Sequence, residues 1–320
     1  MSFRYRQTRR LQEARERRRA VRRRRILASG SLIVVLGVVG TIVIGSASTS
    51  HSGGPRSTAS TKPSARTRST SAAGGEPGTA SAPILTYHVI NVEPAQSGAS
   101  PALYVSTDEF SSQMLALKDE GWHAVTLDQL EAYWTRGTSL GAGKPFVITF
   151  DGGYASQYTN AMPVLRRLGW VGVEDLAVAG LPPAQGGLAD AQIRGMITAG
   201  WELDTEGMTG ADLTTLSSDQ LRHEVAIARQ LLRSRYGVPV NWFSYPLGHY
   251  DATVIDAVRS AGFVGSTTVI SGWASAPQDR FRLPRLQVVS GTSPSQLLSQ
   301  VAAAQVSPDI PSTYSGGPSP

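Results

Sequence analysis

The chain has 320 residues and a formal net charge of +6 at pH 7. The charge is uneven, because residues 1–25 hold twelve Arg and two Glu, whereas residues 83–320 hold fourteen basic and twenty-one acidic residues. An acidic main domain lacks the electrostatic footprint of nucleic-acid binding. The sequence contains no cysteine, which excludes a disulfide framework and a thiolate metal site.

Residues 26–47 form 22 positions without a charged side chain, directly after the basic tail over 1–25. This length is close to the ~20 apolar residues that a helix needs to cross a bilayer. By the positive-inside rule, the tail lies in the cytoplasm and everything after residue 47 lies outside. We therefore expect an uncleaved signal-anchor that holds the protein in the plasma membrane by a single pass. The alternative is a signal peptide cleaved near residues 45–47, which would release a secreted protein.

Residues 48–82 are almost entirely Ser, Thr, Gly, Ala and Pro with a few charged residues. Such a segment cannot bury enough apolar surface to fold, so it is expected to be a flexible linker. Residues 307–320 have the same composition and predict a disordered tail. A single folded domain is expected between them, over 83–306.

Short apolar runs alternate with amphipathic segments along this domain. Strands are predicted over 83–90, 146–150, 171–178, 201–205, 242–245 and 264–270. Helices are predicted to begin at capping boxes on Ser106, Thr126 and Ser217, and to span 156–168, 189–199 and 251–261. With about seven such units, the alternation predicts a parallel sheet rolled into a closed or nearly closed barrel.

Polar residues follow several of these predicted strands, where a barrel of this kind places its site. The positions are Tyr87-His88, Asp151-Gly152, Asp204-Thr205-Glu206 and the segment 244–249. The run Val147–Asp151 is the most informative, because a buried strand that ends in a carboxylate aims that group into a pocket.

Four segments resemble the motifs of the NodB-homology polysaccharide deacetylases, the carbohydrate esterase family 4 type. Thr149–Gly153 resembles the Thr-Phe-Asp-Asp-Gly motif, Ala199–Leu213 the second motif and Trp242–Asp251 the third. Arg282–Leu286 is similar to a Leu-Pro-Arg segment of many members. Their shared order implies the distorted (β/α)7-type barrel of that family, an α/β fold, over the whole domain.

In that family two His and the second Asp bind a divalent metal, and the first Asp is the general base. The resemblance places the base at Asp151 and the three metal ligands at Gly152, Glu206 and Gly210. None of the three ligand types is retained, so the expectation is no metal and no cofactor, with a zinc-type divalent metal only in a rebuilt site. The family's third-motif Arg falls near Ser244, and no Leu-x-His segment follows late in the chain.

Each candidate residue has a functional and a structural interpretation. Asp151 is either a retained base or a carboxylate that caps a helix or binds loop amides. Glu206 either ligates a hard cation or pairs with an arginine. The residues expected to bind substrate are His88, Glu206, Tyr245, Pro246 and Leu247.

Two further groups of side chains leave alternatives open. Glu174 and Asp175 stand where relatives have two apolar aromatic residues, so they either face solvent or belong to an altered site. Aromatic residues near the predicted site are either core or stacking surfaces for sugar rings, namely Trp201, Trp242, Tyr245 and Tyr250.

Three functions are consistent with these features. The first is a membrane-tethered domain that binds N-acetylated cell-wall glycan or peptidoglycan and has lost catalysis. The second is an active hydrolase of carbohydrate N-acetyl amide bonds with a rebuilt site around Asp151. The third is a glycoside hydrolase that pairs Asp151 with Asp204 or Glu206, which requires a carboxyl separation of about 5 to 9.5 Å. The first is favoured because the metal positions are lost.

Overall fold

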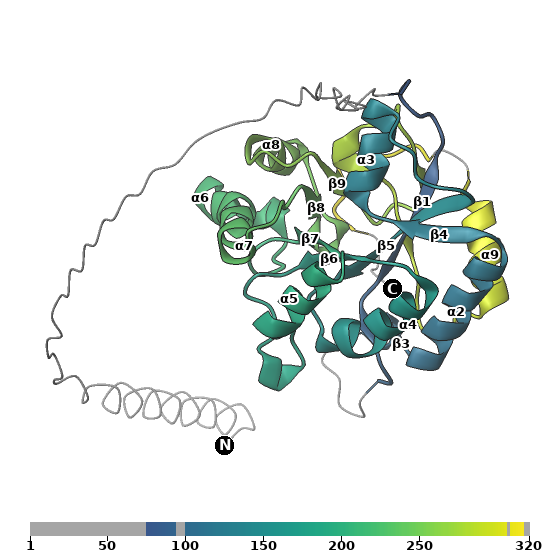
Figure 1. Cartoon of the computed structure of the whole chain (residues 1–320). Helices are drawn as coiled ribbons and strands as arrows, with labels where there is room; N and C mark the ends of the chain where they lie inside the picture. The colour runs from purple at the N-terminus through teal and green to yellow at the C-terminus, as the bar shows by residue number, and fades with distance from the viewer. Residues whose placement is uncertain (1–74, 94–99, 306–307, 317–320) are drawn as a thin grey trace, which may run out of the picture. The chain divides into compact units, whose positions relative to one another are not determined.

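The structure is a computed structural model that describes residues 75–93, 100–305 and 308–316 (Figure 1). The predicted cytoplasmic tail, the signal-anchor over 26–47 and most of the linker lie outside the described residues. Within the described ranges, no helix combines the length and the apolar character needed to cross a bilayer.

The domain is built on one large sheet with the strand order β10-β1-β5-β6-β7-β8-β9, in which β4 also pairs with β5 and β11 with β1. Only β10 runs antiparallel to its neighbour among the described pairs of this sheet. The strands are β1 (Ala82–Tyr87), β4 (Trp122–Val125), β5 (Lys144–Asp151), β6 (Val173–Leu176), β7 (Glu202–Thr205), β8 (Trp242–Ser244), β9 (Gly265–Thr267), β10 (Trp273–Ala274) and β11 (Leu286–Gln287). A separate parallel pair is formed by β2 (Val89–Ile90) and β3 (Tyr104–Val105).

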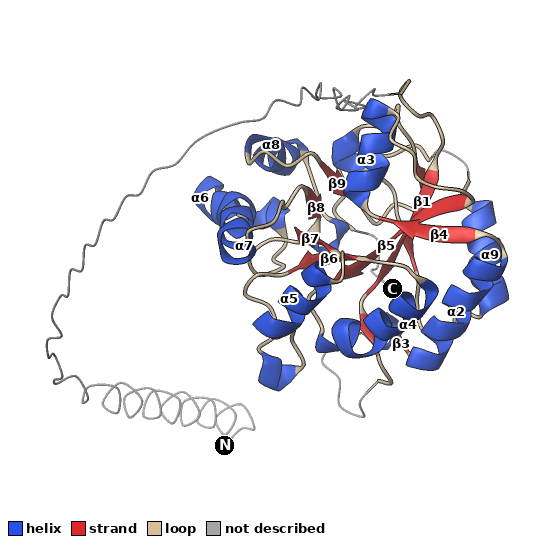
Figure 2. Ribbon diagram, in the orientation of Figure 1, coloured by secondary structure: helices blue, strands red, loops and turns tan. Residues whose placement is uncertain are grey.

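Helices surround the strands, as Figure 2 shows. They are α2 (Thr107–Asp119), α3 (Leu127–Arg136), α4 (Met162–Leu168), α5 (Asp190–Thr198), α6 (Ser218–Arg222), α7 (Ala228–Tyr236), α8 (Ala252–Ser260) and α9 (Pro294–Ala303). The capping boxes predicted at Ser106, Thr126 and Ser217 are confirmed, because each side chain accepts from the backbone N–H three residues on and receives the reciprocal bond.

The predicted α/β fold with a curled parallel sheet is confirmed, but the sheet forms a half-barrel, so it is more open than the predicted closed or nearly closed barrel. In the described part, β9 does not pair directly with β1; the segment 283–287 spans the gap between them. Its first half bonds to the β9 side, where the Arg285 N–H donates to the Ile270 carbonyl at 2.9 Å, and its second half pairs with β1 as β11. Because this segment changes partner midway, Arg285 lies inside the curved sheet, where it reaches Asp151 at the end of β5.

Alternation along β5 separates the two faces of the sheet. Ile148 and Phe150 pack in the larger apolar core with residues of the surrounding helices, whereas Thr149 and Asp151 reach the buried Arg285 on the inner face. The inner face also carries a smaller apolar cluster that includes Val147, one step of alternation below Thr149. The inner face is therefore apolar toward the strand starts and polar toward the carboxyl ends.

Several segments differ from the expectations. The strand β4 and the helix α9 were not predicted. In the case of β4, the strand has only four residues and lies between the end of one helix and the capping box of the next. Residues 78–80 of the predicted linker bond to α3, for example through the Gly78 N–H and the Tyr133 carbonyl at 2.9 Å. In the predicted tail, Tyr314 exchanges two backbone hydrogen bonds with Tyr250, each of 2.8 Å.

Candidate functional site

A cavity of about 280 Å³ lies at the carboxyl ends of β1, β5 and β7. The six residues that the sequence predicts for the site all line it, namely His88, Asp151, Glu206, Tyr245, Pro246 and Leu247. The two glycines at metal-ligand positions, Gly152 and Gly210, line the same cavity. The sequence motifs, which are up to about 160 residues apart, thus converge on one place because parallel strands share one carboxyl edge.

Asp151 is held by a buried arginine. Its two carboxylate oxygens accept from Nη1 and Nη2 of Arg285, each at 2.8 Å, in a bidentate ion pair. The hydroxyl of Thr86 also donates to one oxygen at 3.1 Å and that of Ser244 to the other at 3.2 Å. Asp151 is 5% exposed and Arg285 1%, so the pair lies out of bulk water.

This environment sets the charge of Asp151. Burial by itself would raise the pKa of the carboxyl, but the charge and hydrogen bonds of Arg285 outweigh burial and hold the pKa below its ordinary value. Asp151 is therefore ionised at neutral pH, and its side-chain partners in the described part are other side chains. Among the described residues, the Asp151 side chain therefore neither caps a helix nor bonds to loop amides, so both of these structural interpretations are wrong.

Arg285 is the site residue that sequence reasoning missed. It belongs to the Leu-Pro-Arg segment, but its distance of 134 residues from Asp151 gives no signal of the pairing. Its Nη2 also donates to the Ser244 hydroxyl at 2.9 Å. Ser244 stands near the position where the resemblance places the third-motif Arg, and its hydroxyl and the Arg285 guanidinium both bond to the Asp151 carboxylate.

Three aspartates stand at neighbouring positions of adjacent strands, and of these Asp151 lines the cavity. Strand register places Asp151 of β5 opposite Asp175 of β6, and Asp175 opposite Asp204 of β7. Asp175 is 1% exposed, and its Oδ2 lies 3.6 Å from Nη1 of Arg285. Burial, together with the neighbouring Asp151 charge, raises the pKa of Asp175 well above its ordinary value.

Glu174 and Asp175 are both 1% exposed, so the alternative that they face solvent is wrong. Glu174 lies on the other face of β6, opposite Phe150 in the register. Burial, with the nearby charges of Asp175 and Asp151, raises the pKa of Glu174 well above its ordinary value. Asp204 is also buried, and its Oδ1 accepts from the backbone N–H groups of Asn241 and Trp242 at 2.8 Å.

Glu206 faces the cavity without an arginine partner. Among the described residues no cationic nitrogen lies within 4.0 Å of its carboxylate, so the expected pairing with an arginine is not seen. Burial and the Asp151 charge raise the pKa of Glu206 to about 8. The side chain is therefore largely protonated at neutral pH, beside an ionised Asp151.

The metal-ligand positions have glycine conformations. Gly152 has φ 95°, and a Cβ added there would lie 2.7 Å from Cε2 of Tyr154. Gly210 has φ 71°, and a Cβ there would lie 3.5 Å from Oε1 of Glu206. Both φ values lie in the left-handed region, which costs an ordinary side chain about 1–2 kcal/mol. The backbone at these two positions therefore has a conformation that favours glycine over a residue with a side chain.

The donor set does not match a divalent metal. Of the three family positions, only Glu206 has a donor, and both oxygens of the adjacent Asp151 are bonded to a guanidinium. No cluster of three or more His, Cys, Asp or Glu side chains in the described ranges is placed to hold an ion. A metal needs several converging donors, and a cationic guanidinium beside the remaining carboxylate opposes a second cation.

His88 borders Asp151 in the cavity wall. Burial lowers the pKa of its imidazole, which outweighs the opposite effect of the Asp151 charge. Its Nδ1 is buried and has no hydrogen-bond partner among the described residues. His88 is therefore neutral at pH 7 and has a free ring nitrogen.

The aromatic residues considered for sugar stacking are core residues. The rings of Trp242, Tyr245 and Tyr250 are 1–2% exposed and that of Trp201 is 5% exposed, so none offers a free face. Tyr245 touches the cavity, but its hydroxyl donates to the Phe281 carbonyl at 2.9 Å. At the mouth, Leu247 is 53% exposed and has φ 58°, a rare conformation for a leucine.

The raised carboxyl pKa values give a prediction for stability. A carboxyl whose pKa is higher in the folded than in the unfolded state binds a proton on folding, so stability falls as pH rises between the two values. For Glu206 this window runs from 4.5 to about 8, and for Glu202 from 4.5 to about 7. We expect the Tm of the domain to drop by several degrees between pH 5 and pH 8, measured by calorimetry.

Matched variants test whether these carboxyl groups cause the fall in Tm with rising pH. Glu206→Gln and Glu202→Gln remove the titrating groups and should flatten the profile over the same window. Asp151 acts in the opposite direction, since its lowered pKa gives stability that is lost only as pH falls below its ordinary value of 3.8. A Tm that rises from pH 5 to pH 8 would contradict the assignment.

Fold and cavity together define an α/β half-barrel domain with a polar site at the carboxyl ends of its strands. Residues 141–266 match the family model for polysaccharide deacetylase. YxkH of Bacillus subtilis (strain 168), which its name assigns to the polysaccharide deacetylases, is 28% identical over 211 residues, covering 66% of this chain and 72% of YxkH.

Two solved structures share the fold. BA0330 from Bacillus anthracis, also named as a polysaccharide deacetylase, has a TM-score of 0.62 and 25% identity, covering 70% of this chain and 69% of that one. The Streptococcus pyogenes deacetylase PplD, solved in complex with acetate, has a TM-score of 0.64 and 24% identity, covering 70% of this chain and 99% of that one. This chain is therefore similar to the polysaccharide deacetylases in sequence, over residues 141–266, and in fold.

Proposed function

We propose that this protein is an extracytoplasmic, membrane-tethered member of the family that binds N-acetylated cell-wall glycan or peptidoglycan in the cavity and does not deacetylate it through a metal. Similarity to the family and the location of the cavity at the carboxyl ends of the strands support a glycan as the ligand. The apolar segment over 26–47 supports the tether.

One observation carries the loss of metal-dependent catalysis. The site keeps the base-position carboxylate but holds it in a bidentate pair with Arg285, while two of the metal positions are left-handed glycines. An activated water needs a cation or a base with a free lone pair and a suitable pKa. The ionised, fully bonded Asp151 is a weak base, and the wall residues that remain provide hydrogen bonds for binding.

The test compares binding with turnover. We expect the purified outer region to bind chitotetraose in calorimetry, and to release no acetate from chitotetraose or peptidoglycan with or without added zinc. His88→Ala and Glu206→Ala should weaken binding several-fold, since each removes a polar group that lines the cavity. Acetate release that a chelator stops, and that Asp151→Asn abolishes, would overturn the proposal.

A second candidate, glycoside cleavage, is favoured by one specific observation. Glu206 is a protonated acid with a pKa of about 8 and Asp151 is an ionised carboxylate, and both line the same cavity. A protonated carboxyl such as Glu206 can act as the general acid in cleavage of a glycosidic bond, and Asp151 would have to release Arg285 to act as the second carboxylate. Mass spectrometry of chitohexaose would show shortened chains, lost in Glu206→Gln, if this function holds.

A further inference from the structure

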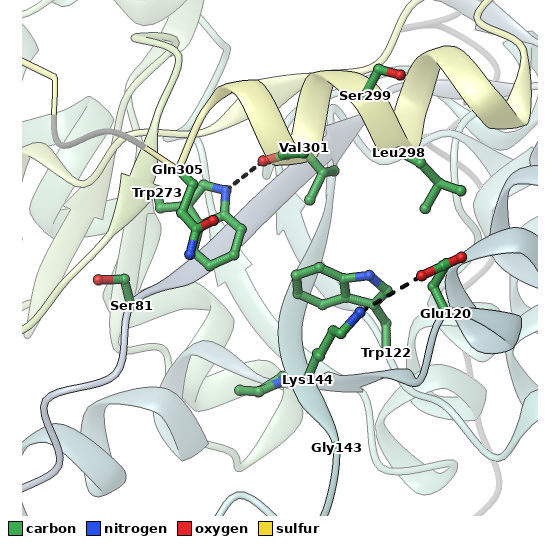
Figure 3. A pocket seen from close by; sticks show the side chains of 12 residues that line it. Ser81, Glu120, Trp122, Gly143, Lys144, Trp273, Leu298, Ser299, Val301 and Gln305 are labelled. Carbon is green, nitrogen blue, oxygen red and sulfur yellow. Dashed lines mark hydrogen bonds and ion pairs between the residues drawn. The ribbon is translucent and has the colours of Figure 1, made fainter.

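A second and larger cavity, of about 720 Å³, lies at the other end of the sheet (Figure 3). It is formed where β1, β4 and β5 begin and where α9 passes over them. Its volume is within the range of small-molecule binding sites. None of the family motifs contributes a residue to it.

Two tryptophans form one side of this cavity. Trp122 and Trp273 meet edge to face, with ring centroids 5.8 Å apart and planes at 73°. The Trp273 indole N–H donates to the Val301 carbonyl at 2.8 Å, which fixes that ring. In Figure 3 the side chains of Val301 and Leu298 point from the helix toward Trp122, so the cavity has apolar surfaces on two sides.

These two rings are the accessible tryptophans of the protein. Both are half-buried, whereas the other four are at most 6% exposed, namely Trp134, Trp170, Trp201 and Trp242. Folding therefore hides four indoles and leaves two at one cavity. Two partly exposed indoles at one cavity indicate a binding site more specifically than scattered apolar residues do.

Polar groups stand at the rim of the same cavity. Lys144 Nζ lies 3.7 Å from a Glu120 oxygen and 5.5 Å from the centroid of the Trp122 ring. The two charged side chains are 54% and 58% exposed, so their hydrogen-bonding capacity is available. Ser299 and Gln305 are exposed at the rim and add hydroxyl and amide groups.

We propose that this cavity binds a pyranose ring of a glycan. A sugar ring has C–H faces that pack on indoles and hydroxyl edges that bond to carboxylate, ammonium and amide groups, which are the two kinds of surface found here. An acyl chain would leave the charged rim without partners. A small anion would be repelled by Glu120, which lies beside Lys144, and a small cation would be repelled by Lys144.

The site is separate from the cavity at the carboxyl ends. Lys144 and Asp151 are the two ends of β5, which at ~3.3 Å per residue places them roughly 23 Å apart. The proposal thus goes beyond the proposed function and does not depend on it. A second sugar site would let the domain hold a wall polymer at two points, raising the effective concentration at each.

Acrylamide quenching of tryptophan fluorescence tests the proposal directly, because the quencher reaches the two accessible indoles and not the four buried ones. We expect chitotetraose or cellotetraose at millimolar concentration to protect the fluorescence from quenching. The two probes differ in their acetamido groups, and protection by either supports a sugar site.

Variants show which residues are responsible for the protection from quenching. Glu120→Ala with Lys144→Ala should weaken protection by about tenfold, since hydrogen bonds to charged groups are lost, and Trp122→Ala should abolish it with the circular dichroism spectrum unchanged. Glu206→Gln, in the other cavity, should leave protection unchanged even if it alters the binding or turnover assigned to that cavity. No protection by either sugar, protection that survives the rim variant, or protection lost in Glu206→Gln would overturn the proposal.

Discussion

Arg285→Met is expected to destabilise the domain by about 3–5 kcal/mol, the loss that follows when one partner of a buried ion pair is removed. The substitution leaves Asp151, which is 5% exposed, charged and without its bidentate partner. A domain of this kind has a total stability of roughly 5–15 kcal/mol. Urea denaturation followed by circular dichroism measures the change as a lower midpoint.

Two comparisons separate the ion pair from general packing. Asp151→Asn combined with Arg285→Met removes both charges and should be more stable than Arg285→Met alone, because no isolated charge remains. Arg222→Met removes an exposed arginine from α6 and should change stability by less than about 0.5 kcal/mol. If Arg285→Met costs less than 1 kcal/mol, Asp151 is not held as the geometry indicates.

Gly152→Asp, which restores the second Asp of the family motif, is expected to destabilise the domain by at least about 2 kcal/mol. The new residue must adopt φ 95° and its Cβ would meet the Tyr154 ring at 2.7 Å, so backbone strain and a steric clash add. We expect no zinc binding from this change alone, since the new carboxylate and Glu206 would supply only two of the three donors that a zinc site needs. Thermal unfolding and metal analysis of the purified variant measure both outcomes.

Gly152→Ala and Gly169→Ala calibrate that result. Gly152→Ala tests the strain and the clash without a carboxylate and should cost nearly as much as Gly152→Asp. Gly169 has φ 75° with nothing within 4 Å of an added Cβ, so Gly169→Ala isolates the backbone term of about 1–2 kcal/mol. A Gly152→Asp protein as stable as the parent would contradict the predicted strain and steric clash at this position.

Local signals in the sequence predicted the described α-helices apart from α9. The side chains of Ser106, Thr126 and Ser217 make the hydrogen bonds that the capping-box pattern requires, because a cap involves residues only three apart. The short strand β4 was missed because four residues carry too little periodicity. Glu174 and Asp175 are buried although charged residues are usually exposed. Their burial follows from the position of β6 between β5 and β7, which the sequence does not reveal.

The candidate site was likewise predicted from the sequence only in part. Its six predicted residues share a cavity because the carboxyl ends of parallel strands meet at one edge, which the alternation of strands and helices already implies. The function of the aromatic residues did not follow from their type. Tyr245 is 2% exposed whereas Trp122 is half-buried at a different cavity, since exposure depends on neighbours distant in the chain.

The sequence by itself determined the order of the elements, the position of the site along the chain and the residue types at the positions that resemble the family's metal ligands. These properties depend on which residue stands at which position and on contacts within a few residues. Only the tertiary structure decided that Asp151 is an ionised partner of Arg285, because a segment 134 residues away must bridge the sheet to form that pair. It also decided that Gly152 and Gly210 have left-handed conformations, since a backbone angle depends on the packing around it.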